Sequence, residues 1–303
     1  MGILTILWEK WVEFRRDFYK ITLAAMILIS QYRGAQDMKS VNSIYALSTA
    51  LNLVLGTLLA VGLICLRGAL FRLMHVPHEL WAEAGAYLAI TAAALPFQAL
   101  MLNFSAFLRA GARMKSIMLI TGLVNVCNIA GNAVLINGLG PLPRLGAAGA
   151  ALSSSIFRVA GFLLMYYAFR QSFPEASASF RQLRPFPGGL MRRLVSIGLP
   201  SGGENLSYQL SQMSCLVFVN MMGTYVVTTR MYAVMFANCI FMLISAVSQA
   251  GQIVIGYQVG ARDLDGDDRC CRRMLKIFCP VTVGLAALLW LFAKPLYGLF
   301  SAD

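Results

Sequence analysis

The chain has 303 residues, of which 58% are hydrophobic and only 13% are charged. A mean hydropathy of +0.68 excludes an ordinary soluble domain, which needs more charge on its surface. The net charge of +12 does not indicate a nucleic-acid-binding protein, because the basic residues gather in alternate loops between apolar segments.

Residues 1–20 predict an amphipathic N-terminal helix that lies in the membrane interface. Apolar side chains recur at helical spacing, and four basic residues lie elsewhere on the helix. The apolar positions are Leu4, Leu7, Trp11, Phe14 and Phe18. An alternative origin for this segment is a displaced start codon or a join between reading frames.

Most of the sequence after residue 20 consists of runs with few or no charges. Each run is long enough to cross a bilayer as a helix. They lie at 40–66, 84–108, 116–143, 145–169, 194–261 and 277–293. The run at 194–261 is long enough for two helices with a turn near Gly223, so we expect seven membrane-spanning helices. The uncharged segment 21–32 is too short to cross alone and is interpreted as the C-terminal part of an eighth. These runs lack the alternation of membrane strands, so we predict an all-α, polytopic helical bundle.

Lys and Arg are distributed unevenly among the loops. Fifteen lie in the first, third, fifth and seventh loops, whereas the other loops and the C-terminal end carry five. An excess of positive charge marks cytoplasmic loops. The sequence therefore predicts a multi-pass protein of the inner (plasma) membrane, with these four loops in the cytoplasm.

The domain organisation follows from a polar stretch and an internal repeat. Residues 170–193 are rich in Pro, Gly and Arg and predict a cytoplasmic linker between an N-lobe at 21–169 and a partial C-lobe at 194–303. Gly34-Ala35-Gln36-Asp37 recurs as Gly260-Ala261-Arg262-Asp263, which is an offset of 226 positions. At the same offset, the segment 70–74 is similar in sequence to the segment 296–300. Short matches also arise by chance, but the shared offset favours a duplicated carrier architecture. Equivalent lobes would mean that this sequence is truncated at both ends.

Several motifs resemble the MATE (multidrug and toxic compound extrusion) transporters. Residues 29–37 resemble the loop after their second helix, and 107–115 resemble their Phe-Arg-Gly-x-Gly-Asp-x-Lys loop, with Ala112-Arg113 replacing the Gly-Asp pair. Four further segments are similar to the fifth to eighth helices of the family. These are Asn125-x-x-Asn128-x-x-x-Asn132 with 138–151, Ile197-Gly198-Leu199-Pro200 followed by Glu204, Ser248-Gln249-Ala250, and 256–261. The resemblance covers residues 21–303.

The resemblance implies a two-lobe carrier fold that opens alternately to each side of the membrane. In this sequence the first helix and the last three of the family's twelve helices are missing, and 194–303 corresponds to helices 7 to 9. The family exports organic, often cationic compounds in antiport with Na⁺ or H⁺. Its acid at the Glu204 position takes part in ion or drug binding, and its two other acidic sites lie in the first and tenth helices, which are absent here.

Glu204 is the residue with the clearest functional signal. A carboxylate at membrane depth is costly and indicates a functional site. Glu204 lies eleven residues after Arg193, which is roughly 16 Å along a helix and near mid-bilayer. Pro200 and Gly202-Gly203 loosen the helix before it. Binding of a proton or Na⁺ would change the charge of Glu204, so we predict that it is an ion-coupling site. The alternative is a structural Glu whose carboxylate is hydrogen-bonded by amides of neighbouring helices.

Other polar residues in apolar segments are candidates for substrate binding. On the helix of Glu204 they are Asn205, Tyr208, Gln209 and Gln212, and in the N-lobe they are Asn128 and Arg158. Tyr208 shares the face of Glu204 and could stack on a cationic ligand. The Asn and Gln side chains could equally join helices by hydrogen bonds. This is the favoured interpretation for Asn128, together with Asn125 and Asn132.

Enzyme, ATP and metal signatures are missing from the sequence. His75 and His78 lie in an outer loop without a zinc-binding pattern, and there is no P-loop or nucleophile elbow. The seven cysteines show neither metal nor disulfide spacing, although Cys270-Cys271 is a possible palmitoylation site. We therefore expect no catalytic residue, no metal and no cofactor besides the coupling ion. The expected partners are small organic substrates and the lipid bilayer, not nucleic acid or ATP.

Three functions stay open at this point. The first is an ion-coupled multidrug exporter. The second is a flippase for lipid-linked oligosaccharides, which would need more cationic side chains in its cavity than Arg158 alone. The third is an inactive fragment that inserts in the membrane, or a chain that pairs with another. The sequence specifies neither the drugs nor the choice between Na⁺ and H⁺.

Overall fold

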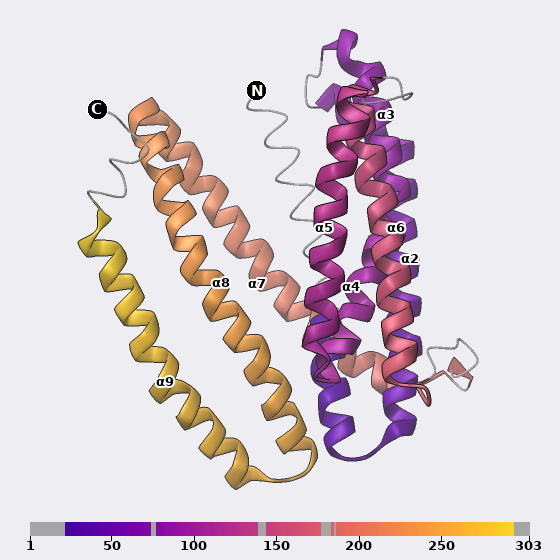
Figure 1. Ribbon diagram of the computed structural model, residues 1–303, viewed down its shortest axis with the longest axis vertical. Coiled ribbons are helices and arrows are strands. Elements are labelled where there is room, and N and C mark those ends of the chain that lie inside the picture. The colour runs from indigo at the N-terminus through magenta and orange to yellow at the C-terminus, as the bar shows by residue number, and fades with distance from the viewer. Residues whose placement is uncertain (1–21, 74–76, 139–143, 177–182, 185, 294–303) are drawn as a thin grey trace. The chain divides into compact units, whose positions relative to one another are not determined.

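The computed structural model describes residues 22–73, 77–138, 144–176, 183–184 and 186–293. The predicted helix at 1–20, His75 and the second half of the repeat at 296–300 lie outside these residues. Within them the secondary structure is helical and contains no strand (Figure 1). The prediction of an all-α protein is confirmed.

The helices follow the expected order. Residues 22–34 are helical. They are followed by α2 (Met38–Leu73), the short η1 (His78–Leu80), α3 (Trp81–Ala93), α4 (Leu95–Ala110), α5 (Met114–Asn137), α6 (Gly146–Ser172), α7 (Gly188–Met221), α8 (Thr224–Gly260) and α9 (Leu264–Leu291). The run predicted at 84–108 is a helix pair that breaks at Ala94, because Pro96 has no backbone N–H to continue the ladder.

Six helical segments in the described part of the chain are long and apolar enough to cross a membrane. They are Met38–Arg72, His78–Ala110, Met114–Asn137, Gly146–Ser172, Tyr225–Gly260 and Asp265–Leu291. The multi-pass prediction is thus confirmed. The seventh expected span, α7, has 34 residues but is not among them. Glu204, Gln209 and Gln212 make its middle more polar than that of the other helices.

The chain divides into two compact units. Unit 1 contains the residues up to Ile29 and Met38–Gly202, and unit 2 contains Ser30–Asp37 with Gly203 and the residues after it. The division falls inside α7 and differs from the predicted lobes. Of the predicted linker at 170–193, residues 188–193 are already helical, and the first half of α7 belongs to unit 1.

Unit 1 has a packed core. Helix α6 packs against α3, α4 and α5, and α2 packs against α3 and α4, so that these helices run side by side (Figure 1). Tyr45 of α2, Phe107 of α4 and Phe169 of α6 are fully buried together. The ring of Tyr45 lies 4.6 Å from that of Phe107 and 5.0 Å from that of Phe169. Aromatic pairs at such distances stabilise beyond the area they bury.

Unit 2 is far less buried. Helix α8 packs against α9, and Gly251 allows the Met274 side chain to approach the α8 backbone. Among the described residues from Gly203 onward, Ile253 is the buried apolar side chain. The outward faces of α7, α8 and α9 are apolar, as expected of helices whose surroundings are lipid or further protein.

One turn geometry occurs three times. The turns at 31–37, 107–113 and 257–263 close with the same three backbone hydrogen bonds, such as Asp37 N to Tyr32 O at 2.9 Å and Asp263 N to Gln258 O at 3.0 Å. Each has a residue in the left-handed region, at Gln36 (φ 59°), Ala112 (φ 57°) and Arg262 (φ 60°). The sequence offset of 226 between Gln36 and Arg262 therefore coincides with a repeat of backbone structure. The third copy, at 107–113, is too divergent in sequence to be recognised as a repeat of the other two.

Candidate functional site

Helix α7 carries the predicted ion-coupling residue. The helix is continuous from Gly188 to Met221 and passes through Pro200 without ending. Glu204 lies in its middle, directly after the point between Gly202 and Gly203 where the two units divide. A Cβ at either glycine would meet nothing within 4 Å, so this stretch of α7 is not held by close neighbours.

The Glu204 side chain is exposed, and so is Tyr208 one turn further on. The two share one face of α7, as their spacing predicted. No hydrogen bond or ion pair holds Glu204 in the described parts of the chain, so neighbouring helix amides do not satisfy its carboxylate there. An open carboxylate beside a phenol ring can bind a proton, a metal cation or an organic cation.

Gln212 lies two turns beyond Glu204 and has a partner in the next helix. Arg230 of α8 donates from Nη2 to Gln212 Oε1 at 3.0 Å, and its other terminal nitrogen, Nη1, is buried without a hydrogen-bond partner. The Gln212 carbonyl therefore joins α7 to α8. Gln209 is half-buried, and the Asn205 side chain lies outside the described residues.

Asn128 lies in a polar stripe between α5 and α6 of unit 1. Its Nδ2 donates to Ser154 Oγ at 3.4 Å, and its backbone carbonyl accepts from Ser153 Oγ at 3.4 Å. Asn132 Nδ2 donates to Asn128 Oδ1 at 3.3 Å, while Asn132 Oδ1 is buried and unpaired. These contacts agree with the interpretation that Asn128 joins two helices. They leave Asn132 Oδ1 as a buried acceptor that is available to a ligand. Asn125 is exposed.

Arg158 is a half-buried cation of α6 in the interior of a predicted span. It lies four residues after Ser154 and therefore on the same face of the helix. Its guanidinium is close enough to act electrostatically on Tyr87 of α3. The predicted substrate residues thus fall into two groups, with Asn128 and Arg158 in unit 1 and the α7 residues in unit 2.

A fully buried polar network on α2 and α4 was not singled out from the sequence. Ser48 Oγ donates to Asn103 Oδ1 at 2.5 Å, Asn52 Nδ2 donates to the same oxygen at 3.2 Å, and Asn103 Nδ2 donates to Thr49 Oγ1 at 3.0 Å. Asn52 Oδ1 has no partner. Two asparagines inside uncharged runs were the available signal, since amides in membrane helices usually bond across helices.

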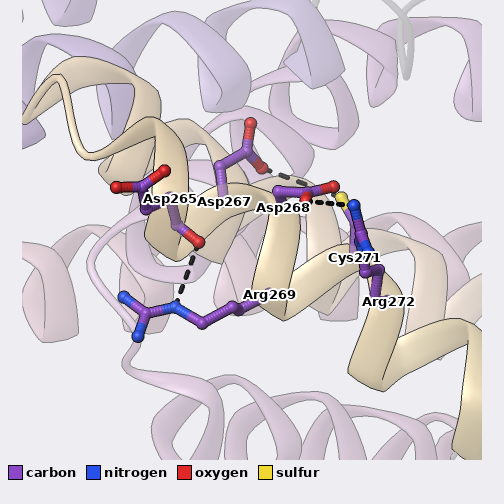
Figure 2. Close-up of polar contacts among 6 residues, drawn as sticks. All are labelled: Asp265, Asp267, Asp268, Arg269, Cys271 and Arg272. Atoms are coloured by element: carbon purple, nitrogen blue, oxygen red, sulfur yellow. Dashed lines mark hydrogen bonds and ion pairs between the residues drawn. The ribbon is translucent and has the colours of Figure 1, made fainter.

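The start of α9 is charged and internally paired (Figure 2). Asp263 caps the helix by accepting from Gly266 N at 2.9 Å. Arg272 and Asp268 form an ion pair at 2.7 Å, and the Cys271 thiol donates to Asp267 Oδ1 at 3.7 Å. Across the described residues, no group of three His, Cys, Asp or Glu side chains could hold a metal ion. These polar groups match the end of a helix at the membrane surface.

Comparison with known proteins gives consistent matches at low to moderate identity. A family model described as MatE matches residues 18–134 and 200–303. An uncharacterized transporter of Bacillus subtilis, YisQ, is 31% identical over 284 residues, which are 94% of this chain and 62% of that protein. A probable multidrug resistance protein NorM of Aromatoleum aromaticum is 28% identical over 253 residues, which are 80% of this chain and 53% of that protein. The chain thus spans less than two thirds of these relatives.

Solved structures share the fold. A multidrug resistance MATE family transporter in an outward-facing conformation matches with a TM-score of 0.84 at 20% identity, over 100% of this chain and 66% of the other. The Vibrio cholerae MATE transporter VcmN in its bent form matches with a TM-score of 0.82 at 19% identity, over 100% and 67%. At such identities the likeness concerns the arrangement of the helices.

Proposed function

Because this chain belongs to the MATE family of multi-pass membrane transporters, we propose that it acts in secondary active efflux of organic compounds, exchanging them for Na⁺ or H⁺. The observation that carries the proposal is the family match on both sides of the division in α7, together with relatives named as probable multidrug resistance proteins. The bilayer and small organic molecules are the proposed partners, with no ATP, nucleic acid or catalytic step.

Glu204 is the proposed coupling residue. Among the described acidic residues it is the one that lies in the middle of a long helix, whereas the others lie in loops or in the first turns of helices. Its carboxylate is open to bind a cation. A proton or Na⁺ and a cationic substrate would compete for the same negative charge, and this competition supplies the exchange that an antiporter needs.

The position of Glu204 supports a link between binding and movement. The residue directly follows the division between the two units, in a stretch of α7 that contains Pro200 and two unobstructed glycines. Neutralising the carboxylate changes the charge at the point where α7 passes from one unit to the other. A binding event can shift a conformational equilibrium only when it differs in strength between the two states, so the proposal requires that Glu204 bind the ion more tightly in one state than in the other.

Tyr208, Gln209, Gln212 and Asn205 are the proposed substrate contacts beside Glu204. Tyr208 is exposed on the face of Glu204 and offers an aromatic surface to an organic cation. Gln212 would take part indirectly, because its carbonyl accepts a hydrogen bond from Arg230. In unit 1, Asn128 and Arg158 are proposed as a second polar patch for substrate.

Efflux of a fluorescent cation tests the proposal in cells that lack their own exporters. The chain is compared with Glu204→Gln, and Glu175→Gln serves as the matched control, because Glu175 is exposed in the loop after α6. Glu204→Gln keeps the size of the side chain but cannot take up a proton, so we expect efflux to fall at least about tenfold. The control should export normally. Equal efflux from all three would refute the role of Glu204, and absence of efflux from all three, with normal insertion, would identify an inactive chain.

A further inference from the structure

Helix α9 has one side that faces α8 and one side that faces away from it. The Met274 side chain approaches the α8 backbone at Gly251. The half-buried side chains Cys270, Met274, Phe278 and Thr282 recur every four residues and mark the side that faces α8. The opposite side of α9 is the exposed side.

Four basic side chains lie on that exposed side, just before the apolar run at 277–293. Their spacing is i, i+3, i+4 and i+7, which puts them on one face of a helix, and all four are exposed. We call this face the basic stripe, and it consists of Arg269, Arg272, Arg273 and Lys276. It lies on the far side of the helix from Met274, because a helix turns by about 100° per residue.

The charges of the basic stripe are only partly balanced by neighbouring groups. Arg272 forms the ion pair with Asp268 at 2.7 Å, and Arg269 donates from Nε to a backbone carbonyl one turn earlier at 3.1 Å (Figure 2). Within the described parts of the chain, Arg273 and Lys276 make no hydrogen bond and no ion pair. The unbalanced positive charge therefore lies at the end of the stripe that is nearest to the apolar run.

The basic stripe lies at the depth of lipid headgroups. Lys276 directly precedes 17 uncharged residues, 277–293, which as a helix are roughly 26 Å long and match a hydrocarbon core of roughly 30 Å. Trp290 is 78% exposed near the other end of this run, and Trp is enriched at membrane interfaces. The stripe from Arg269 to Lys276 is roughly 10 Å long, so it crosses the polar headgroup layer of roughly 5–8 Å.

The order of charges along α9 indicates which ligand the stripe binds. Asp265 and Asp268 precede the apolar run by roughly 13 Å or more, which places them toward the water and not at the level of the lipid phosphates. The basic side chains lie between these acids and the apolar run. Basic side chains at this depth attract anionic headgroups, and each one adds to the affinity. An exposed apolar surface below them would meet the lipid tails.

We propose that the basic stripe of α9 is a binding site for an anionic phospholipid of the cytoplasmic leaflet. The distribution of Lys and Arg assigns this end of α9 to the cytoplasm. Arg273 and Lys276 bind the lipid phosphate, and the bound headgroup fixes the depth of α9 in the membrane. The site uses none of the residues proposed for ion or substrate, so it stands independently of the proposed transport activity.

Lipid retention by the purified chain gives the first test. The full chain is purified in detergent with equal amounts of palmitoyl-oleoyl phosphatidylglycerol, which is anionic, and palmitoyl-oleoyl phosphatidylcholine, which is zwitterionic. Free lipid is removed by gel filtration, and the retained lipid is quantified by mass spectrometry. We expect phosphatidylglycerol to exceed phosphatidylcholine at least about threefold. Equal retention of the two lipids would overturn the site.

A double substitution separates the stripe from the general positive charge of the chain. Arg273→Gln/Lys276→Gln should weaken the binding of dioctanoyl phosphatidylglycerol, titrated by microscale thermophoresis, at least about tenfold. Arg113→Gln/Lys115→Gln is the matched control, because it removes one exposed Arg and one exposed Lys from another predicted cytoplasmic turn. The control should change the affinity less than about twofold. Equal weakening by both double substitutions would overturn the site.

Two further measurements distinguish charge from shape and lipid from free phosphate. Arg273→Lys/Lys276→Arg keeps both charges and should bind phosphatidylglycerol as the unaltered chain does, whereas a loss as large as that of the Gln variant would overturn an electrostatic site. Inorganic phosphate, added in large excess, should displace little of the lipid, because the buried acyl chains add to the affinity. Complete displacement would assign the stripe to a soluble phosphate and overturn the lipid site.

Discussion

Unit 1 and unit 2 are both built from long apolar helices, yet among the described residues the buried core lies almost entirely in unit 1. Phe107 in unit 1 is 0% exposed, whereas Phe241 in unit 2 is 64% exposed. The difference shows that apolar composition specifies helices that can enter a membrane, whereas burial depends on which helices are present to pack. In a bilayer, exposed apolar faces cost little, because lipid tails are as apolar as the side chains.

Truncating an aromatic side chain in each unit gives the strongest test of this comparison. Phe107→Ala removes a buried ring that contacts Tyr45 and Phe169, so we expect the free energy of unfolding to fall by about 3–5 kcal/mol. Phe241→Ala removes an exposed ring and should cost less than about 1 kcal/mol. Denaturant titration in detergent micelles measures both, and equal losses would mean that the two units do not differ in packing.

The buried amide network of unit 1 should show the next largest effect. Asn103→Ala leaves Ser48 and Asn52 without their shared acceptor, and we expect a loss of about 1–3 kcal/mol because buried polar groups become unpaired. Asn137→Ala, at the exposed end of α5, is the control and should be near neutral. A neutral Asn103→Ala would show that water or another side chain replaces the amide.

In unit 2, local capping should matter more than surface charge. Asp263→Ala removes the cap of α9 and should cost about 1 kcal/mol. Asp268→Ala breaks an exposed ion pair with Arg272 and should cost about 0.5 kcal/mol or less. Amide hydrogen exchange in the first turns of α9 measures both effects, and the reverse order would contradict the assignment of Asp263 as the cap.

The coupling between α7 and α8 should also be small. A double-mutant cycle with Gln212→Ala and Arg230→Ala isolates their hydrogen bond, and we expect about 0.6 kcal/mol, as is typical for such bonds in membrane helices. The cycle is measured by thermal unfolding in micelles. A coupling near zero would mean that the bond does not hold the helices of unit 2 together.

Much of the fold was predictable from uncharged runs alone, because backbone groups in lipid must be satisfied within helices. The start of α5, both ends of α6 and the turn at Gly223 lie close to the expected positions, whereas α5 ends at Asn137, before the predicted end at 143. The division inside α7 was not predictable, because it depends on tertiary contacts and not on a local feature of the sequence. The linker at 170–193 is polar, but polarity marks a loop and not the border between packed units.

The residues of the candidate site could be named from the sequence, but their contacts could not. Glu204 was evident because an isolated carboxylate in an apolar run is rare, and its shared face with Tyr208 followed from helical spacing. The Arg230–Gln212 bond joins two helices whose relative rotation is set by tertiary packing. The close approaches of Gly34 to Tyr257 and of Gly260 to Gln31 were equally hidden, since the repeat of Gly34 at Gly260 indicates a common origin but not that the two copies meet.

Gly34 lies against Tyr257 and Gly260 lies against Gln31, and one offset of 226 relates the two pairs. This two-fold symmetry bears on how such a carrier could have arisen. A surface in which Gln31 meets Gly260 while Tyr257 meets Gly34 is self-complementary, like the isologous interface of a homodimer. A single ancestral repeat could therefore have assembled with a second copy of itself before the two genes were joined. After fusion, the copies could diverge almost everywhere, provided that positions 30, 34, 256 and 260 stayed small.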